Sequence, residues 1–206
     1  MQLLKLFAFY LATTLYFSVG TANAQQIDVK ALAATIKQGG YVIVFRHGAT
    51  NRDQADTDPL NHDNIAKQRQ LSETGRSIAV QVGQEFKVLQ IQFAKTYTSK
   101  FNRAVETGKL LSASPQTSII DITEGGLVVS PIENDRRAES LRKLASQVPE
   151  PGTNILVVTH KPNIIDAFGK DWFDVKEGEA AVFQPNVSGK LTLVARLQAA
   201  DWLKKQ

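Results

Sequence analysis

The sequence lacks cysteine entirely, and this absence narrows the chemistry open to the chain. Neither disulfide bonds nor thiolate metal sites are available, so stability must come from packing. The chain also lacks a GxxxxGK[ST] loop and a GxGxxG fingerprint, which leaves nucleotide-driven chemistry without support. Its net charge is only +4, spread without basic runs, so a nucleic-acid partner is not expected and a phosphate-attracting pocket is enough to explain the excess.

The start of the chain carries its longest apolar stretch. Residues 1–24 contain one lysine, an apolar core and small residues at Ala22 and Ala24, a pattern typical of a secretory signal peptide. Threonines and a serine thin out the core, whereas a membrane anchor needs ~20 apolar residues. We expect cleavage before Gln25 and a mature protein, without a membrane anchor, in the periplasm or outside the cell. Residues 25–206 then form one domain.

Short apolar runs alternate with amphipathic stretches along the rest of the chain. This alternation predicts a three-layer α/β/α fold whose largely parallel sheet is covered on both faces. Two runs near the end, separated by residues 186–189, predict an antiparallel hairpin. The expected helices are 27–38, 71–89, one that begins near 102, 135–147 and 163–168; the expected strands end near 46, 99, 123 and 159, and the hairpin strands are 179–185 and 190–197.

Two histidines each follow a buried strand, which is where ligands bind in a parallel sheet. His47 follows YVIVFR, and His160 follows NILVVT. Either histidine alone is more often a structural residue, but a third element strengthens the case. Arg103 lies in the first turn of a predicted helix, whose free N–H groups suit an anion. Together these elements predict a phosphate pocket.

In these residues the chain resembles the histidine phosphatase superfamily, which has the phosphoglycerate mutase-like fold. The resemblance covers about residues 41–163. The shared motifs are an Arg-His-Gly triplet at 46–48 with a nearby Thr50, a Leu-Ser-x-x-Gly helix start at 71–75, a Thr-Ser-x-x-x-Arg-Ala-x-x-Thr stretch at 98–107, and a strand that ends in His160.

The resemblance implies that His47 is a nucleophile that becomes phosphorylated. It places Arg46, Arg103 and His160 around the phosphoryl group, with Thr50 as a further substrate contact. Chemistry agrees with this set, because arginines neutralise the charge of a phosphoryl group. Adjacent positive charge also lowers the pKa of a histidine and favours its neutral, nucleophilic form.

The proton donor for the leaving group is less clearly marked. In the acid phosphatase branch an aspartate follows the second histidine, but here Lys161 stands in that place. The mutase-like branch takes a glutamate after the strand that follows the helix of Arg103. Glu124 matches this place, and Glu133 is the alternative. Either glutamate could instead be a solvated loop residue. We assign the role to Glu124, leaving Glu133 open.

The segment 53–63 carries four aspartates and superficially resembles a calcium loop. It has no glycine at the sixth position, and Asn64 stands where a bidentate glutamate belongs. A solvated lid over the pocket is therefore expected, and His62 within it has no assigned role.

Together these observations predict a secreted, metal-independent phosphatase that hydrolyses small phosphomonoesters through a phosphohistidine, with no cofactor. One alternative is a catalytically weak module that binds phosphate or a phosphosugar. A phosphoglycerate mutase is a further alternative, ranked lower because its substrate belongs to glycolysis, inside the cell. The natural substrate is not encoded in any of these motifs.

Overall fold

The computed structural model describes residues 28–186, 188–189 and 191–204. The expected signal peptide at 1–24 lies outside these residues. Short 3-10 helices span Ile65–Lys67, Ile120–Ile122 and Lys170–Trp172. The main elements in chain order are α1 (Val29–Ile36), β1 (Val42–Arg46), α2 (Glu73–Val88), β2 (Phe93–Ser99), α3 (Asn102–Leu111), β3 (Gln116–Ile119), α4 (Pro131–Ala145), β4 (Asn154–Thr159), α5 (Lys161–Phe168), β5 (Ala180–Pro185), β6 (Leu191–Leu197) and α6 (Ala199–Trp202).

The described strands form one sheet in the order β3-β2-β4-β1-β5-β6. The first four run parallel, β5 is antiparallel to β1, and β6 is antiparallel to β5. This confirms the predicted, largely parallel sheet and its terminal hairpin. Strands β1 and β4 are central neighbours and pair in parallel up to Arg46 and Thr159. The residues that follow them therefore emerge side by side at one edge of the sheet.

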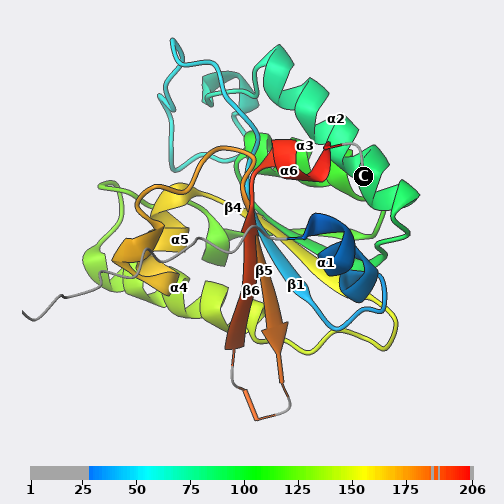
Figure 1. The fold of residues 1–206 in the computed structure, drawn as a ribbon. Coiled ribbons are helices and arrows are strands. Elements are labelled where there is room, and N and C mark those ends of the chain that lie inside the picture. The colour runs from blue at the N-terminus through cyan, green and yellow to red at the C-terminus, as the bar shows by residue number, and fades with distance from the viewer. Residues whose placement is uncertain (1–27, 187, 190, 205–206) are drawn as a thin grey trace, which may run out of the picture.

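Helices cover both faces of the sheet, as Figure 1 shows. Side chains alternate along β1, so that Ile43 and Phe45 pack against α1, α2, α3 and α6 on one face. Val42 and Val44 pack against α4 and α5 on the other. These two cores account for the apolar runs of the central strands, which are buried on both sides. Among the described helices, none is long and apolar enough to cross a membrane.

Two boundaries differ from the prediction. Helix α4 begins at Pro131 rather than 135, because Ser130 caps it by accepting a hydrogen bond from the Glu133 N–H. Strand β3 ends at Ile119 rather than 123, because its partner β2 ends at the paired Ser99. The chain then turns in a 3-10 helix, and this turn leads Glu124 to the carboxyl edge of the sheet.

Candidate active site

The two strand-end histidines lie together. The His47 N–H donates to the carbonyl oxygen of Thr159, which locks the end of β1 against β4. The rings of His47 and His160 have their centroids 5.0 Å apart, and both side chains are almost completely buried. The parallel register of β1 and β4 is thus the direct cause of the histidine pair.

His47 is held in one orientation and one protonation state. Its Nδ1 lies 2.8 Å from the carbonyl oxygen of Gly48, which can only accept, so Nδ1 carries the proton. Burial and the charges of Arg103 and Arg46 lower the pKa of His47 well below its ordinary value. The ring is therefore neutral near pH 7, and Nε2 keeps the lone pair that a nucleophile needs.

The segment after His47 is fixed by two helices. Thr107 of α3 accepts a hydrogen bond from the Gly48 N–H and donates to the Arg103 carbonyl oxygen. At the start of α2, Ser72 bonds to the Ala49 carbonyl oxygen, and Gly75 lies so close to it that a Cβ would be 2.1 Å away. These contacts explain the motif positions, because Thr107 and Gly75 hold the segment that follows His47.

Arg103 is fully buried between two carboxylates. Its Nη1 lies 2.9 Å from Asp56 Oδ1, and its Nη2 lies 3.2 Å from Glu124 Oε2. Its guanidinium also stacks on the ring of Phe101, 4.2 Å from the centroid. A buried cation must be paired, and both partners here come from loops rather than from the sheet.

His160 is oriented by a serine at the end of the neighbouring strand. Its Nε2 lies 2.6 Å from the Ser99 hydroxyl, and its Nδ1 lies 3.4 Å from Glu124 Oε2 without a well-formed hydrogen bond. Burial and the charge of Arg103 lower the pKa of His160 well below its ordinary value. His160 is therefore neutral too, and Glu124 contacts both His160 and Arg103.

The two candidate glutamates have different surroundings. Glu124 lines the cleft beside His47, whereas Glu133 lies on α4 and is not among the lining residues. Hydrogen bonds from Arg136 and Arg137 lower the pKa of Glu133 to about 2. A carboxyl group that stays ionised in this way is a poor proton donor, so the geometry favours Glu124.

Arg69 belongs to the site although the sequence analysis did not single it out. It lines the cleft with Arg46, and its Nε is buried without a hydrogen-bond partner in the described part of the chain. The Arg69 backbone N–H donates to Asp56 Oδ1, the atom that also pairs with Arg103. The only signal in the sequence is its place two residues before the Leu-Ser-x-x-Gly motif.

Thr50 is not among the residues that line the cleft beside His47. Its hydroxyl donates to Glu177 at 2.8 Å, and it lines a neighbouring cavity rather than the cleft. The expected anion site at the start of α3 is also partly occupied, because the Asn102 N–H donates to the Gln68 side-chain oxygen. Thr50 as a substrate contact stays a prediction, and the Asn102 N–H is already engaged by a residue of the loop before α2.

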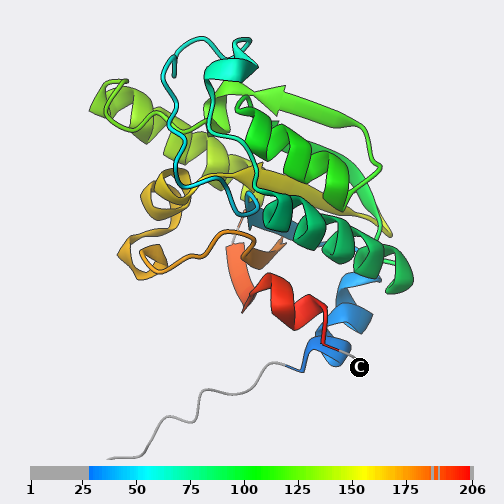
Figure 2. The same ribbon diagram turned by 90° about the horizontal axis from the view of Figure 1, so that it is seen from above.

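Asp56 departs from the expectation of a solvated lid. Its carboxylate reaches inward to Arg103, while Asp53 stays exposed. Figure 2 shows the loop of residues 51–70, in cyan, between β1 and α2. Within the described residues, no group of three or more His, Asp or Glu side chains is arranged to hold a metal ion.

The site opens to the surface through a cleft of about 380 Å³. Arg103 and His160 are fully buried and are not among the lining residues; Glu124, which contacts both, is. The residues that line the cleft are Arg46, His47, Arg69, Glu124, Lys161, Pro162, Ile165 and Asp166. The arrangement offers a neutral imidazole, cations that suit a phosphoryl group, and a carboxyl group within one pocket.

Comparison with known proteins agrees with this geometry. Residues 42–127 match the sequence model of the histidine phosphatase superfamily (branch 1). The curated proteins contain no significant match.

Solved structures share the fold at low sequence identity. The protein histidine phosphatase SixA, complexed with tungstate, is 19% identical with a TM-score of 0.56, over 78% of this chain and 98% of its own. A phosphoserine phosphatase variant from Entamoeba histolytica, in complex with phosphoserine, is 15% identical with a TM-score of 0.52. The match covers 78% of this chain and 98% of the phosphatase. A mycobacterial glucosyl-3-phosphoglycerate phosphatase is 14% identical with a TM-score of 0.53. The match covers 75% of this chain and 97% of that phosphatase. Residues 42–127 are thus similar to the histidine phosphatase superfamily, and the chain shares the fold of these solved structures.

Proposed function

We propose that this protein is an exported phosphatase that hydrolyses small phosphomonoesters through a phosphohistidine on His47. The observation that carries the proposal is the state of that ring. Its Nδ1 proton is held by the Gly48 carbonyl oxygen, and its pKa is lowered by burial and by Arg103. A histidine that served only to hold the fold would not need an unprotonated Nε2 beside three arginines.

The first half-reaction transfers the phosphoryl group to the enzyme. Nε2 of His47 attacks phosphorus, the bond from phosphorus to the ester oxygen breaks, and the alcohol leaves with that electron pair. Arg46, Arg69 and Arg103 neutralise the phosphoryl oxygens during the transfer. A phosphoryl oxygen that binds Nη2 of Arg103 takes the place of the Glu124 carboxylate.

Displaced from the Arg103 cation, Glu124 takes up a proton from solvent, turns towards the leaving oxygen and donates that proton to it. In the second half-reaction a water molecule, deprotonated by Glu124, attacks the phosphohistidine. Inorganic phosphate leaves, and His47 returns to its neutral form. The fold relatives support this reaction class, since the names of several are those of phosphatases.

The test uses the protein without its first 24 residues and a generic aryl phosphate. His47→Ala should reduce phosphate release to background, because it removes the imidazole that forms the proposed phosphohistidine. Rapid quenching of the unsubstituted protein should trap acid-labile, base-stable phosphate on His47. The control is His62→Ala, which removes a histidine outside the cleft.

We further infer that the reaction needs no metal ion, because the arginines supply the positive charge that metal enzymes take from bound cations. Phosphate release should therefore persist in EDTA. Label on another residue, substantial activity in His47→Ala, or EDTA inhibition that zinc or magnesium reverses would contradict the mechanism.

A further inference from the structure

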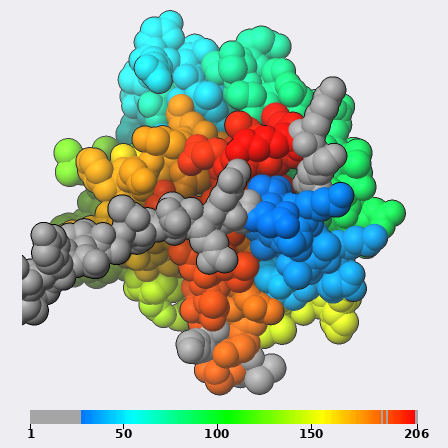
Figure 3. Space-filling view, viewed as in Figure 1, coloured from blue at the N-terminus to red at the C-terminus, as the bar shows by residue number. Residues whose placement is uncertain are grey.

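A second cavity opens beside the cleft. Its volume is about 500 Å³, and Arg46 and Arg69 line both spaces. Figure 3 shows the residues near 50, in cyan, against those near 175, in orange, on the molecular surface. The lining residues are Arg46, Ala49, Thr50, Arg52, Arg69, Lys176 and Glu177.

Positive charge dominates this second cavity. Its lining contains four cationic side chains and a single carboxylate, that of Glu177. Glu177 accepts the Thr50 hydrogen bond and lies 3.8 Å from Nη2 of Arg46, so it is already engaged. It cannot neutralise the remaining cations as well.

Two of these cations are available to a ligand. Arg52 and Lys176 are exposed, and neither side chain makes a hydrogen bond or ion pair with the described residues. Lys176 acts on Asp174 only as a nearby charge, and Asp174 is itself paired with Arg196. Exposed cations are common, but here they share a cavity with two arginines of the site.

The other end of the cleft is different in character. There Pro162 and Ile165 supply apolar surface, and the charge of Lys161 is opposed by that of Asp166. The excess of positive charge is therefore confined to one side of Arg46 and Arg69, the side away from α5. A substrate whose reacting phosphate lies at Arg46 and Arg69 would therefore meet an excess of further cations only in the second cavity.

We propose that the second cavity binds a second phosphate of the substrate, so that the preferred substrates are small bisphosphates. This inference rests on the proposed phosphatase function and specifies its substrate class. A phosphate dianion matches the two unpaired cations Arg52 and Lys176, whereas a carboxylate would neutralise only one. The guanidinium of Arg52 can hold two phosphate oxygens at once, and Lys176 adds a point charge.

The test compares three alkyl phosphates that share a carbon chain and differ at its far end. The far group is a second phosphate, a carboxylate or a hydroxyl, and chains of two to six carbons are compared. We expect kcat/KM for the best bisphosphate to exceed that of its hydroxyl partner by about 10- to 100-fold, the usual effect of a charged hydrogen bond. The bisphosphate has two equivalent esters and the hydroxyl partner has one, so a twofold higher kcat/KM is expected without any binding in the second cavity.

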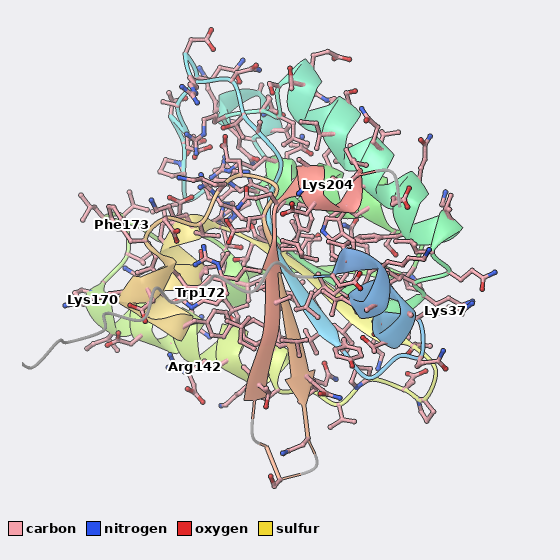
Figure 4. All side chains as sticks on the ribbon, viewed as in Figure 1. Lys37, Arg142, Lys170, Trp172, Phe173 and Lys204 are labelled. Atoms are coloured by element: carbon pink, nitrogen blue, oxygen red, sulfur yellow. The ribbon has the colours of Figure 1, made fainter. Side chains whose placement is uncertain are left out.

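The double variant Arg52→Gln, Lys176→Gln should lower this ratio to about that factor of two. The matched control is Lys37→Gln, Lys87→Gln, which removes the same charge at another cavity. Figure 4 labels Lys37 beside α1, away from the loop of residues 51–70. In this control the ratio of kcat/KM between bisphosphate and hydroxyl partner should be unchanged. Both values come from one preparation, so a misfolded fraction lowers them equally and does not alter the ratio.

The other possible results contradict either the bisphosphate inference or the proposed phosphatase function. A ratio near two in the unsubstituted protein, or a high ratio that survives the double variant, overturns the inference and leaves the proposed function intact. Equal kcat/KM for the carboxylate and the bisphosphate would show that one negative charge at the far end suffices. That result overturns the proposal that the second cavity selects a phosphate. Failure to hydrolyse any ester, nitrophenyl phosphate included, contradicts the proposed function and the inference with it.

Discussion

In the proposed mechanism Glu124 donates the proton to the leaving group, and its contribution should vary with the leaving group. Alkyl phosphates expel a strongly basic alkoxide, whereas nitrophenolate leaves almost without help. General acid catalysis contributes about 10² to 10⁴ where it is needed. Glu124→Gln should therefore lower hydrolysis of alkyl phosphates by this factor and largely spare nitrophenyl phosphate, as measured by kcat for both substrates.

Glu133→Gln is the matched control for that experiment. Glu133 lies on α4 and is held ionised by Arg136 and Arg137, so its substitution should change neither rate. The reverse pattern would transfer the role to Glu133. Equal, small losses in both variants would show that neither carboxyl group is the acid.

The buried histidines should make folding stability depend on pH. His47 and His160 are neutral in the folded protein, since burial lowers both pKa values well below 6.5. In the unfolded chain each binds a proton below about pH 6.5, so the unfolded state takes up more protons. The free energy of unfolding must then fall as the pH drops from 7 to 5.5, by up to about 1.4 kcal/mol per pH unit for each histidine.

Urea unfolding at several pH values in this window measures that slope. The window lies above the range in which carboxyl groups titrate, so they contribute little. His47→Gln should lower the slope by up to about one proton, whereas an unchanged slope would show that His47 binds a proton in the folded protein as readily as in the unfolded chain. Glu133→Gln should leave the slope as it is, because its pKa of about 2 lies far below the window.

At the scale of elements, the loop of residues 51–70 does more than cover the site. Asp56 joins the Arg69 N–H to the Arg103 guanidinium, and Gln68 caps the first N–H of α3. The loop thus carries one arginine of the site and pairs another. This follows from contacts between segments far apart in sequence, so the composition of the loop, which suggests only a polar surface lid, does not reveal it.

Asp56→Ala should detach this loop. Without its carboxylate, the Arg69 N–H and Nη1 of Arg103 lose a partner, and a charged hydrogen bond is worth about 1.5 to 3 kcal/mol. We expect amide hydrogen exchange in residues 51–70 to become about tenfold faster or more, and kcat/KM to fall by a similar factor.

Asp53→Ala is the control for this experiment, because Asp53 is exposed and makes no hydrogen bond or ion pair with the described residues. It should leave both measurements unchanged. Equal exchange in Asp56→Ala and the unsubstituted protein would show that other contacts hold the loop.

The elements themselves differ in how far the sequence predicts them. Strong local signals, such as the Ser72 cap of α2 and the buried runs of β1 and β4, predicted elements that the structure confirms. The start of α4 was wrong although its signal, Ser130 followed by a proline, was present. The end of β3 could not be predicted, because it depends on where the neighbouring strand stops.

At the scale of the molecule, strand order decides what the site contains. Histidines more than a hundred residues apart meet because β4 lies beside β1, and Arg103 joins them because β2 lies beside β4. The family motifs predicted this group. They did not predict Arg69 or the second cavity, because these depend on loop conformations that no short motif encodes.

The proposed export also concerns the whole molecule, because the compartment decides which substrates the site can meet. The small residues Ala22 and Ala24 flank Asn23 just before Gln25, which matches the pattern that signal peptidase cleaves. Mass spectrometry of the protein purified from its native compartment should therefore find a chain that begins at Gln25. Ala24→Arg should block this cleavage, because the peptidase pocket accepts only small side chains there. Asn23→Gln, at the position between them, should not. An intact Met1 would return the enzyme to the cytoplasm, where glycolytic phosphates are available and a mutase activity would again have to be tested.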